Sequence, residues 1–274
     1  MRLSGARALV TGGSSGIGRA VALEAARRGC VVTIAGSDPD RVAAVADRLA
    51  AGGPAPSPSS RRAGDAPGRI PGQSTPPVVC DFADPAAVSD LADRLAREPA
   101  FDVVVHSAGI GLRGPAGDLA APDLDRLLAV NVRAPLLLTK AVLGPMLQRG
   151  SGRLVFVGSI AGAVGAAGEA AYAASKAALA AYADSLRAEL AGSGVGVTVL
   201  LPGVVDTAFF TRRGTPYHRS RPRPIRAERV ARALLRAVER DRDLLVAPGW
   251  LRVPIALHGV TPQSFGRLAG RFGR

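Results

Sequence analysis

The sequence predicts an α/β protein with a doubly wound parallel sheet of about seven strands and helices on both faces. Two observations support this prediction. Short apolar runs alternate with segments of helical period along most of the 274 residues, as in consecutive strand–helix–strand units with right-handed crossovers. A glycine-rich turn also joins the first strand to the first helix. We expect one domain over residues 1–248 and a C-terminal extension over 249–274.

The composition is that of a soluble globular protein, with 47% hydrophobic, 21% charged and 4% aromatic residues. No run approaches the ~18 apolar residues that a membrane-spanning helix needs. The apolar stretch near the N-terminus is too short for a cleavable signal. The cytoplasm is therefore the expected location.

The formal net charge of +13 raises the question of binding to nucleic acid or membranes, which requires a clustered basic patch. Many arginines lie in helical segments beside Asp or Glu, and only residues 212–229 form a cluster. We interpret this cluster as a solvated or substrate-facing loop and expect no specific nucleic-acid binding. Docking to anionic lipid or nucleic acid is the alternative, and salt would abolish it.

The two cysteines are predicted to be buried thiols. Cys30 should open the second strand and Cys80 should close the third. Because these are opposite ends of parallel neighbours, the two lie beyond the reach of a disulfide, which is under ~7 Å between Cα atoms. The sequence shows no spacing typical of metal ligands, so no metal site is expected.

The first strand, 6–10, runs into TGGSSGIG and then into a helix over 19–29. A strand, a glycine-rich turn and a helix N-terminus in this order predict a phosphate cradle, because glycines allow close backbone approach and the helix dipole favours negative charge. The glycine spacing differs from the usual dinucleotide fingerprint. We expect cofactor contacts from Thr11, Gly12, Ser14, Ser15, Gly16, Ile17 and Gly18.

The second strand, 31–35, and the helix over 39–50 enclose the tip Gly36, Ser37 and Asp38. An acid at this tip selects a free ribose 2′-hydroxyl, whereas basic or hydroxyl groups admit a 2′-phosphate. Glycine stands where the acid would be expected and Ser37 can donate to a phosphate, so NADP(H) is favoured. NAD(H) remains the alternative, because Asp38 would favour a free ribose 2′-hydroxyl if its side chain points inward.

The segment 52–77 consists mostly of Gly, Pro and Ser and is predicted to be a flexible surface insertion. The third strand over 78–82 then carries Asp81 and Phe82, where Asp81 could accept from an adenine amine or cap the helix over 85–98. The fourth strand, 101–109, ends in Ala108 and Gly109, which suit a backbone passing under a ligand. His106 is interpreted as a packed histidine.

The second half of the chain holds the candidate catalytic set. Asn131, the sole asparagine, lies in a helical region over 123–147, and the fifth strand, 152–158, delivers Ser159. Tyr172 and Lys176 are one turn apart on a helix over 172–191, so both side chains leave the same face. Lys176 is one of only two lysines among 35 Lys and Arg residues. The sixth strand (195–203), a helix (226–240) and a last strand (244–248) complete the pattern.

These motifs resemble those of the short-chain dehydrogenases/reductases in their small single-domain form, over about residues 4–247. The resemblance rests on TGGSSGIG, Ala108-Gly109, the VNV around Asn131, Ser159, Tyr172-x-x-x-Lys176 and Pro202-Gly203. It implies a Rossmann-like fold and hydride transfer between nicotinamide and a carbonyl or secondary alcohol. It also implies that Lys176 bonds the nicotinamide ribose, that Thr207 bonds the carboxamide, and that Pro202, Gly203 and Val205 line the cofactor site.

Tyrosine has a pKa near ~10 and is a poor base at neutral pH, while a nearby cation lowers an acid's pKa by ~1–3 units. We therefore expect Lys176 to lower the pKa of Tyr172, and Ser159 to hydrogen-bond the substrate oxygen. The family suggests that Asn131 holds a water in a proton relay. The family also commonly has two asparagines where this chain has His106 and Ser107.

The substrate is expected to be hydrophobic. The loop over 206–222 should cover the cleft, and Phe209 and Phe210 beside arginines suggest a substrate with an apolar body and an acidic head. Tyr217 in the same loop could touch substrate, whereas Tyr182 is expected to pack. The extension over 249–274 could pack at a subunit contact, line the pocket or lie on a membrane surface, of which we favour packing. The alternative function is a catalytically silent cofactor-binding scaffold or sensor.

The resemblance further implies a homodimer or homotetramer. The helices that carry Asn131 and Tyr172 are the expected contact faces, because alanine and leucine occupy more sides of these helices than one core needs.

Overall fold

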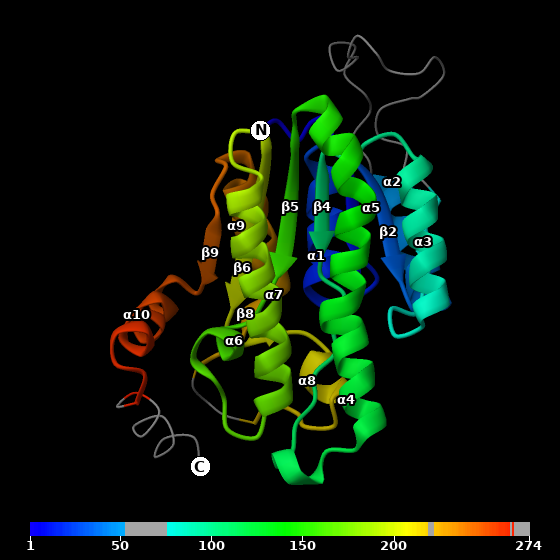
Figure 1. Cartoon of the computed structure of the whole chain (residues 1–274). Coiled ribbons are helices and arrows are strands. Elements are labelled where there is room, and N and C mark those ends of the chain that lie inside the picture. Colours follow the sequence, from blue (N-terminus) through cyan, green and yellow to red (C-terminus); the bar gives the residue numbers. More distant parts are fainter. Residues whose placement is uncertain (53–75, 219–221, 264, 266–274) are drawn as a thin grey trace.

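A computed structural model of the chain describes residues 1–52, 76–218, 222–263 and 265. Its centre is a seven-stranded, all-parallel sheet in the order β3-β2-β1-β4-β5-β6-β9 (Figure 1). The predicted doubly wound sheet is therefore confirmed. The strands are β1 (Arg7–Thr11), β2 (Val31–Gly36), β3 (Val78–Val79), β4 (Val103–His106), β5 (Gly152–Val157), β6 (Val195–Pro202) and β9 (Leu244–Ala247).

The strand order reverses between β1 and β4, and this reversal creates the crevice where open α/β sheets bind ligands. Thr11, the last residue of β1, pairs in register with Ala35 of β2 and His106 of β4. Neighbouring strands thus end at the same level. The loops that follow them all emerge at one edge of the sheet, the lower edge in Figure 1.

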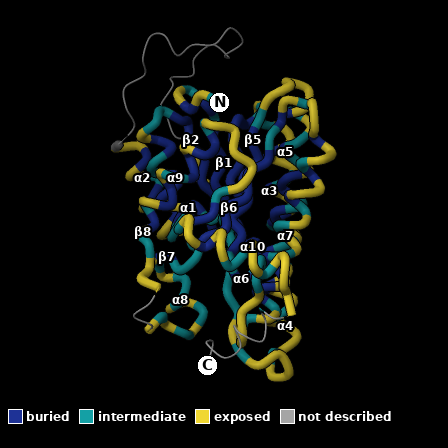
Figure 2. Tube along the Cα trace, turned by 90° about the vertical axis from the view of Figure 1, so that its left-hand side faces the viewer, coloured by how far each residue is buried: buried dark blue, intermediate teal, exposed yellow. Residues whose placement is uncertain are grey.

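Helices cover both faces of the sheet and enclose two apolar cores. One layer is formed by α1 (Gly16–Arg27), α2 (Pro39–Gly52) and α9 (Ala227–Glu239). The other layer is formed by α3 (Pro85–Arg97), α5 (Ala134–Arg149) and α7 (Ala170–Glu189). Figure 2 shows the buried sheet between the two layers. Because both faces are covered, the strands are continuous apolar runs rather than alternating ones.

The helical region around Asn131 consists of α4 (Ala121–Leu128), a π-helical turn η3 (Ala129–Arg133) and α5. Among the described residues, Ala121–Arg149 is one stretch long and apolar enough to cross a membrane, with a mean hydropathy of 1.5. This corrects the expectation that no segment approaches that composition. Core helices of soluble proteins meet the same criterion, and 44% of the apolar window is buried here, so the finding is weak evidence for a membrane span.

Several short elements at the lower edge were not predicted. A two-stranded pair joins β7 (Val205–Asp206) to β8 (Ile225–Arg226), and α6 (Ile160–Val164) and α8 (Phe209–Arg212) follow β5 and β7. Beyond β9 come the 3-10 turn η4 (Gly249–Leu251) and α10 (Arg252–Val260), and η2 (Ala116–Asp118) precedes α4. Most of the predicted 52–77 insertion, residues 53–75, lies outside the described residues.

Both cysteines are buried and unbridged. Cys30 comes just before β2 and Cys80 just after β3. Their thiols lie near the carbonyl oxygens of Leu3 and Ala87, at 3.2 and 3.6 Å. Burial raises their pKa values to about 12 and about 11. The prediction of buried structural thiols is confirmed, and both groups stay protonated and weakly reactive at neutral pH.

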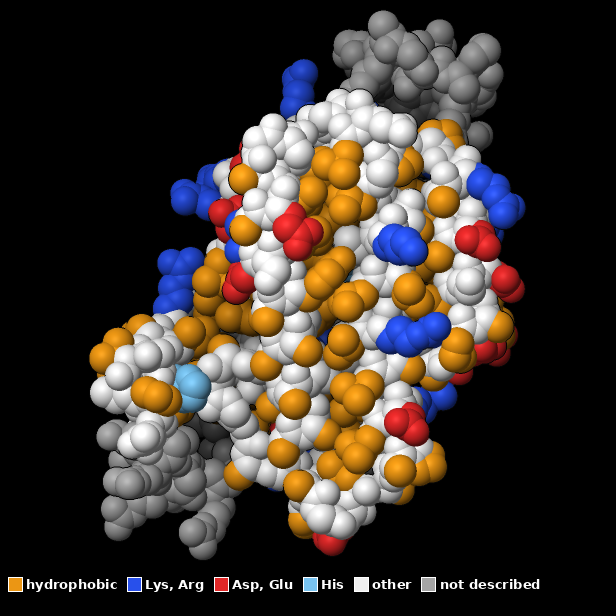
Figure 3. Space-filling view, in the orientation of Figure 1, with side chains coloured by type: hydrophobic (Ala, Val, Ile, Leu, Met, Phe, Trp, Pro, Cys, Tyr) orange, Lys and Arg blue, Asp and Glu red, His pale blue; other side chains and the backbone are white. Residues whose placement is uncertain are grey.

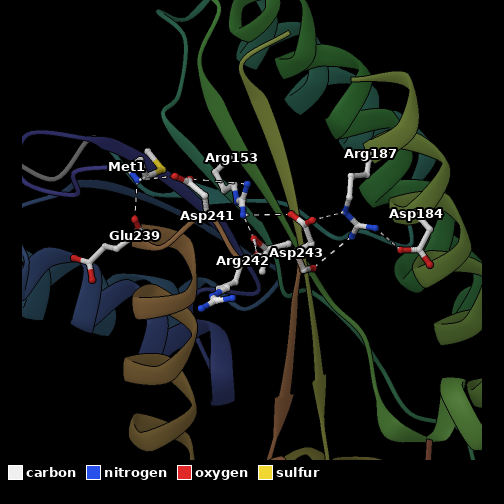
Figure 4. Close-up of polar contacts among 9 residues, drawn as sticks. Met1, Arg153, Asp184, Arg187, Glu239, Asp241, Arg242 and Asp243 are labelled. Atoms are coloured by element: carbon white, nitrogen blue, oxygen red, sulfur yellow. Dashed lines mark hydrogen bonds and ion pairs between the residues drawn. The ribbon is translucent and has the colours of Figure 1, made fainter. Parts of the chain in front are cut away.

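The opposite edge of the sheet is tied together by charged side chains (Figure 4). Arg153 of β5 is buried, and its guanidinium lies 4.0 Å from Asp241 and 3.7 Å from Asp243. Its Nε donates to Thr198 Oγ1 on β6 at 2.9 Å. These contacts connect β5, β6 and the turn before β9, far from the edge where the glycine-rich loop lies.

His106, at the end of β4, is packed as predicted. Its ring stacks on Phe156 with centroids 5.0 Å apart, and its Nε2 lies 3.0 Å from Thr139 Oγ1. Thr139 gives its own hydrogen to the carbonyl of Pro135, so His106 Nε2 must be the donor. Nδ1 is buried without a partner among the described residues. A neutral imidazole fits this environment, and a charged one would bury an unpaired N–H.

Replacing His106 with asparagine is expected to make the free energy of unfolding depend less on pH below pH 6.5. Burial lowers the pKa of His106 from 6.5 to about 3, so the unfolded chain binds a proton that the folded protein excludes. In the wild type this makes the free energy of unfolding fall by roughly 1.4 kcal/mol per pH unit below pH 6.5. Thermal unfolding between about pH 4 and 8 measures the slope. His258→Gln on α10 is the control, and an unchanged slope in His106→Asn would contradict the buried neutral ring.

Candidate active site

The loops at the lower edge of the sheet enclose a cavity of about 1270 Å³. The helices α4, α6, α8 and α10 lie around this end of the molecule (Figure 1). The cavity brings together most of the residues that the sequence singled out: Gly12, Ser14, Ser15, Gly16, Ile17, Ser37, Asp81, Phe82, Ala108, Gly109, Ser159, Tyr172, Lys176, Pro202, Gly203, Val205 and Thr207. Thr11, Gly18 and Asn131 are not among the residues that line it.

The glycine-rich loop is shaped so that side chains are excluded from it. Gly12 has φ +65°, and a Cβ there would lie 2.7 Å from the Ala108 nitrogen. Gly16 has φ +53°, and a Cβ on Gly18 would collide with the Gly12 carbonyl oxygen. Glycine alone satisfies both the left-handed backbone and the close approach at Gly12. Thr11 supports the loop from below, since its Oγ1 accepts from the nitrogens of Ser107 and Ala108, each at 3.2 Å.

The N-terminus of α1 fits a negatively charged group. Ser15 precedes the helix, and its side chain makes no capping hydrogen bond among the described residues. The first turn also contains no acidic residue. The first amides of the helix therefore face the cavity without a side-chain acceptor, and the helix dipole favours an anion there. These observations fit the pyrophosphate of a dinucleotide.

The adenosine end of the cavity is basic. Gly36 stands where an acid would select NAD, and a Cβ there would lie 2.6 Å from Ser14 Oγ and 2.9 Å from Val42 Cγ2, so a larger side chain would have to displace both neighbours. Asp38 does not line the cavity, because its carboxylate accepts from the Arg41 nitrogen at 2.9 Å and pairs with the Arg41 guanidinium at 2.8 Å. Arg41 and Arg212 do line it. The pKa of Arg212 is lowered by burial and by repulsion from Arg41, which an anion between them would relieve.

Asp81 serves the turn after β3 rather than α3. Its Oδ1 accepts from the Ala83 nitrogen at 3.0 Å, and Asp84 caps α3 by accepting from the Ala86 nitrogen at 2.9 Å. The alternative interpretation of Asp81 as the helix cap is therefore wrong. Its other oxygen lies 3.5 Å from Arg126 at the cavity wall.

Tyr172 is buried beside Ser159 at the floor of the cavity. Burial raises the pKa of Tyr172 to about 12, and a hydrogen bond to Ser159 lowers it, with Glu169 raising and Arg213 lowering it further. The expected reduction by Lys176 is not found. Burial is the largest cause of the shift and Lys176 is not among the causes, although its Nζ lies 6.0 Å from the centre of the Tyr172 ring. Tyr172 thus keeps its proton at neutral pH, and it can donate this proton to a substrate oxygen.

Lys176 is held against the sheet. Its Nζ donates to the Val157 carbonyl at 3.0 Å, and burial lowers its pKa to about 8. The base of the lysine side chain packs against α6, since a Cβ on Gly162 would lie 2.9 Å from Lys176 Cβ and 2.8 Å from the Ala177 nitrogen. The ammonium is therefore fixed near the cavity and retains two further N–H donors.

Asn131 is fully buried and its amide is paired with the chain. Oδ1 accepts from the Ile110 nitrogen and Nδ2 donates to the Ile110 carbonyl, both at 2.9 Å, and Nδ2 also donates to Ser175 Oγ at 3.0 Å. Both N–H donors are thus used. The side chain ties the loop after β4 to α7, and the water-holding role remains a prediction that these contacts do not test.

At the nicotinamide end, Thr207 lies against the glycine-rich loop. The methyl carbon of Thr207 would be 3.4 Å from a Cβ on Gly16. Its Oγ1 accepts from the Phe209 nitrogen at 3.3 Å. A Cβ on Gly203 would lie 2.7 Å from Leu251 Cδ1, so the segment after β6 packs directly on the C-terminal extension.

Residues 6–57 and 59–217 match the family model described as short chain dehydrogenase. The chain belongs to this family. It is an NAD(P)-dependent short-chain dehydrogenase/reductase with a Rossmann-like sheet, as the motifs implied. The match extends over more than half of the chain, and it includes the glycine-rich loop, Ser159, Tyr172 and Lys176.

Two curated relatives illustrate the range of similarity. The dehydrogenase is 30% identical over 275 residues to dehydrogenase/reductase SDR family protein 7-like of Anopheles gambiae, covering 96% of this chain and 81% of the relative. It is 34% identical over 207 residues to the probable oxidoreductase EphD of Mycobacterium tuberculosis, covering 75% of this chain. The matched part spans only 32% of EphD.

Solved structures of similar proteins extend the comparison. A short-chain dehydrogenase from Sphingobium yanoikuyae in complex with NADPH is 26% identical, with a TM-score of 0.79 and coverage of 94% and 95% of the two chains. The bulky-bulky ketone specific alcohol dehydrogenase from Comamonas testosteroni is 25% identical, with a TM-score of 0.75 and 94% of each chain covered. A Burkholderia phymatum relative in complex with NAD shares the fold at 23% identity, with a TM-score of 0.80 and 96% of each chain covered.

Sequence reasoning missed several residues that line the cavity of this dehydrogenase. Arg41 carried no distinguishing signal, because it lies on an ordinary amphipathic helix. Glu169 is close to Tyr172 in sequence and could have been found from that proximity. Arg113, in the loop after β4, and Arg126, on α4, were also missed. Arg212 and Arg213 belong to the cluster that was interpreted as a solvated or substrate-facing loop. Pocket lining was one of the alternatives for the extension, which contributes Trp250, Leu251, Pro254 and Phe265. The extension therefore lines the pocket, and Leu251 also joins the apolar core.

Proposed function

We propose that this dehydrogenase reduces the carbonyl group of a hydrophobic ketone with NADPH, and that Tyr172 donates the proton. The observation that carries the proposal is a buried Tyr172 that lines, together with Ser159 and Lys176, a cavity that also fits a dinucleotide. When bound, the nicotinamide supplies the hydride. The chain's own residues orient the carbonyl and supply the proton.

Ser159 and Tyr172 form the hydrogen-bonding pair for the reacting oxygen. Ser159 precedes α6, and its Oγ accepts from the Ala161 nitrogen at 3.2 Å, so the hydroxyl orientation is fixed by the backbone. Its hydrogen is directed away from that amide and can stabilise charge developing on the carbonyl oxygen. Tyr172 then donates its proton to the same oxygen. The group is already in the protonated form that reduction requires at neutral pH.

Lys176 and Asn131 support the pair. Lys176 offers N–H donors to the ribose next to the nicotinamide. Asn131 fixes the loop after β4, on which Gly109 faces Lys176, since a Cβ on Gly109 would lie 3.2 Å from Lys176 Nζ. Asn131 thus acts on the site through the position of that loop.

The substrate end of the cavity is apolar, which supports a hydrophobic ketone. Its walls come from the loop after β4, from α6, from α8 and from the C-terminal extension. The Comamonas testosteroni relative, described as specific for bulky-bulky ketones, supports the same substrate class. The apolar side chains are Ile110, Val164, Phe209, Phe210, Trp250, Leu251 and Pro254.

The reaction is tested with purified protein, NADPH and a panel of ketones of increasing bulk. We expect oxidation of NADPH with bulky apolar ketones, at a higher kcat/KM than with small polar ones. A protein that binds NADPH and turns over no carbonyl compound in the panel would instead support the cofactor-binding scaffold.

Cofactor choice gives a second test. Arg41→Gln is expected to lower the ratio of kcat/KM with NADPH to kcat/KM with NADH by about tenfold to a hundredfold, because a charged hydrogen bond to the 2′-phosphate contributes about 1.5–3 kcal/mol. Arg48→Gln, which changes an exposed arginine on the same helix, is the control. A wild-type preference for NADH, or an unchanged ratio in Arg41→Gln, would contradict the proposed phosphate site.

We also propose a homo-oligomer that buries the outer faces of α5 and α7. Figure 3 shows a band of hydrophobic side chains along this face, with few charges among them. Leu128 on α4 and Leu147 on α5 are 49% and 42% exposed. Sedimentation analysis of the wild type and of a variant with Leu147→Glu tests this, and a monomeric wild type would overturn it.

A further inference from the structure

A buried ion pair joins the two loops that cover the substrate end of the cavity. Arg213 Nη1 lies 2.7 Å from Glu169 Oε1, and their side chains are only 4% and 17% exposed. Glu169 precedes α7, and Arg213 follows α8. The pair therefore links the loop before Tyr172 to the end of α8. Because burying both charges is costly in desolvation, stability alone is a weak explanation for the pair.

The Arg213 guanidinium is held in a fixed position. Its central carbon lies 4.6 Å from the centre of the Phe210 ring and 5.7 Å from that of Phe209. On another side, a Cβ on Gly111 would lie 3.1 Å from Arg213 Cδ. Stacking on aromatic rings is a favourable environment for a planar cation. The group is thus preorganised before substrate binds.

Most of the hydrogen-bonding capacity of Arg213 is unused. A guanidinium has five N–H donors, and among the described residues the Arg213 side chain donates a single hydrogen bond, to Glu169. Its Nε is buried without a partner in this part of the chain. Buried donors without partners are costly. Because Arg213 lines the cavity, the N–H groups of its other terminal nitrogen can donate to an acceptor oxygen carried in by a ligand.

The charge of the Glu169–Arg213 pair determines which kind of ligand oxygen can bind next to Arg213. Glu169 already neutralises Arg213, so a ligand carboxylate would meet one positive and one negative group and gain little. An uncharged acceptor, such as the carbonyl oxygen of an ester or amide, receives a hydrogen bond from Arg213 without strong repulsion from Glu169. The Phe209 ring lies 5.6 Å from the Tyr172 ring, which places the acceptor one aromatic ring away from the proton donor.

We propose that Glu169 and Arg213 select substrates that carry a second, uncharged oxygen near the reacting carbonyl, and that Glu169 excludes a carboxylate at that position. The proposal rests on the proposed ketone reduction and narrows its substrate class to apolar ketones with an ester-like or amide-like group. Arg213 binds the second oxygen, and Glu169 sets the charge that Arg213 presents.

The test compares three matched compounds with NADPH: an apolar ketone, a γ-oxo ester of the same length and the corresponding γ-oxo acid. Wild type is expected to prefer the ester. Arg213→Met should lower the ratio of kcat/KM for ester to ketone by about tenfold to a hundredfold, the loss of one charged hydrogen bond. Glu169→Gln preserves shape, and should raise the ratio of acid to ester by about tenfold or more. Arg226→Met, at an 82% exposed side chain, is the control and should keep wild-type ratios.

Equal losses for ester and ketone in Arg213→Met, or an unchanged acid-to-ester ratio in Glu169→Gln, would overturn the proposal and leave a purely structural pair. Calorimetric binding of the three compounds to the NADP⁺ complex, which holds no hydride to transfer, gives the same ratios without turnover. A chain that binds the ester selectively but reduces none of the compounds would therefore refute the reaction while supporting the selection.

Discussion

Tyr172→Phe is expected to lower kcat for ketone reduction by about a hundredfold to ten-thousandfold, the range that a positioned proton donor contributes. The substitution removes a single oxygen from a side chain that is 7% exposed and packed against Leu127 and Ala173. The pKa of about 12 means that the wild-type hydroxyl holds its proton throughout the neutral range. The variant keeps the ring and the fold but has no proton to donate. Steady-state rates with NADPH and a bulky ketone measure the loss.

Tyr182→Phe provides the matched control. Tyr182 lies on the same helix, with its ring edge-on to Phe156 at 5.7 Å, and it does not line the cavity. Its loss should leave kcat within about twofold. The dissociation constant of NADPH should stay the same in Tyr172→Phe. A Tyr172→Phe enzyme that reduces ketones as fast as wild type would show that another group supplies the proton.

The sheet was predictable because a parallel strand buried on both faces leaves a strong signal. The run VVTIA gave β2 to within one residue, and the last helix, expected over 226–240, is α9 (Ala227–Glu239). The third strand was expected over 78–82 but spans only Val78–Val79. β3 is an edge strand and pairs with β2 alone. Because hydrogen bonds to a second neighbour are missing, the strand ends earlier than its apolar sequence predicts.

The site was less predictable, because only the residues close to strand ends can be placed from the order of the strands. Ser159 comes directly after β5, and Tyr172 and Lys176 are fixed by helical period, so their convergence could be anticipated. Arg213 reaches the cavity through α8, and Trp250 through the turn after β9. No periodicity links these loops to the sheet. The pKa of Tyr172 was also mispredicted, since charge proximity can be guessed from sequence and desolvation cannot.

Gly12→Ala is expected to weaken NADPH binding at least tenfold and to destabilise the fold by about 2–4 kcal/mol. The left-handed backbone at φ +65° alone disfavours alanine by about 1–2 kcal/mol. The new Cβ would also lie 2.7 Å from the Ala108 nitrogen and 2.9 Å from the Ser107 carbonyl carbon, both backbone atoms of the loop just after β4. The loop must move away from β4, and the amides that face the cofactor move with it. Fluorescence titration with NADPH and thermal unfolding measure the two effects.

Gly117→Ala separates this effect from a general intolerance of glycine substitution. Gly117 lies in η2, has no left-handed φ, and its Cβ would meet nothing within 4 Å. The free energy of unfolding of the Gly117→Ala variant should therefore change by less than about 0.5 kcal/mol, and its affinity for NADPH should be unchanged. If Gly12→Ala unfolds at lower temperature but binds NADPH like wild type, the strain is real and the loop does not hold the cofactor. If the contact between Gly12 and Ala108 shapes the phosphate cradle, Gly12→Ala should lose both stability and NADPH affinity. Gly117→Ala should lose neither.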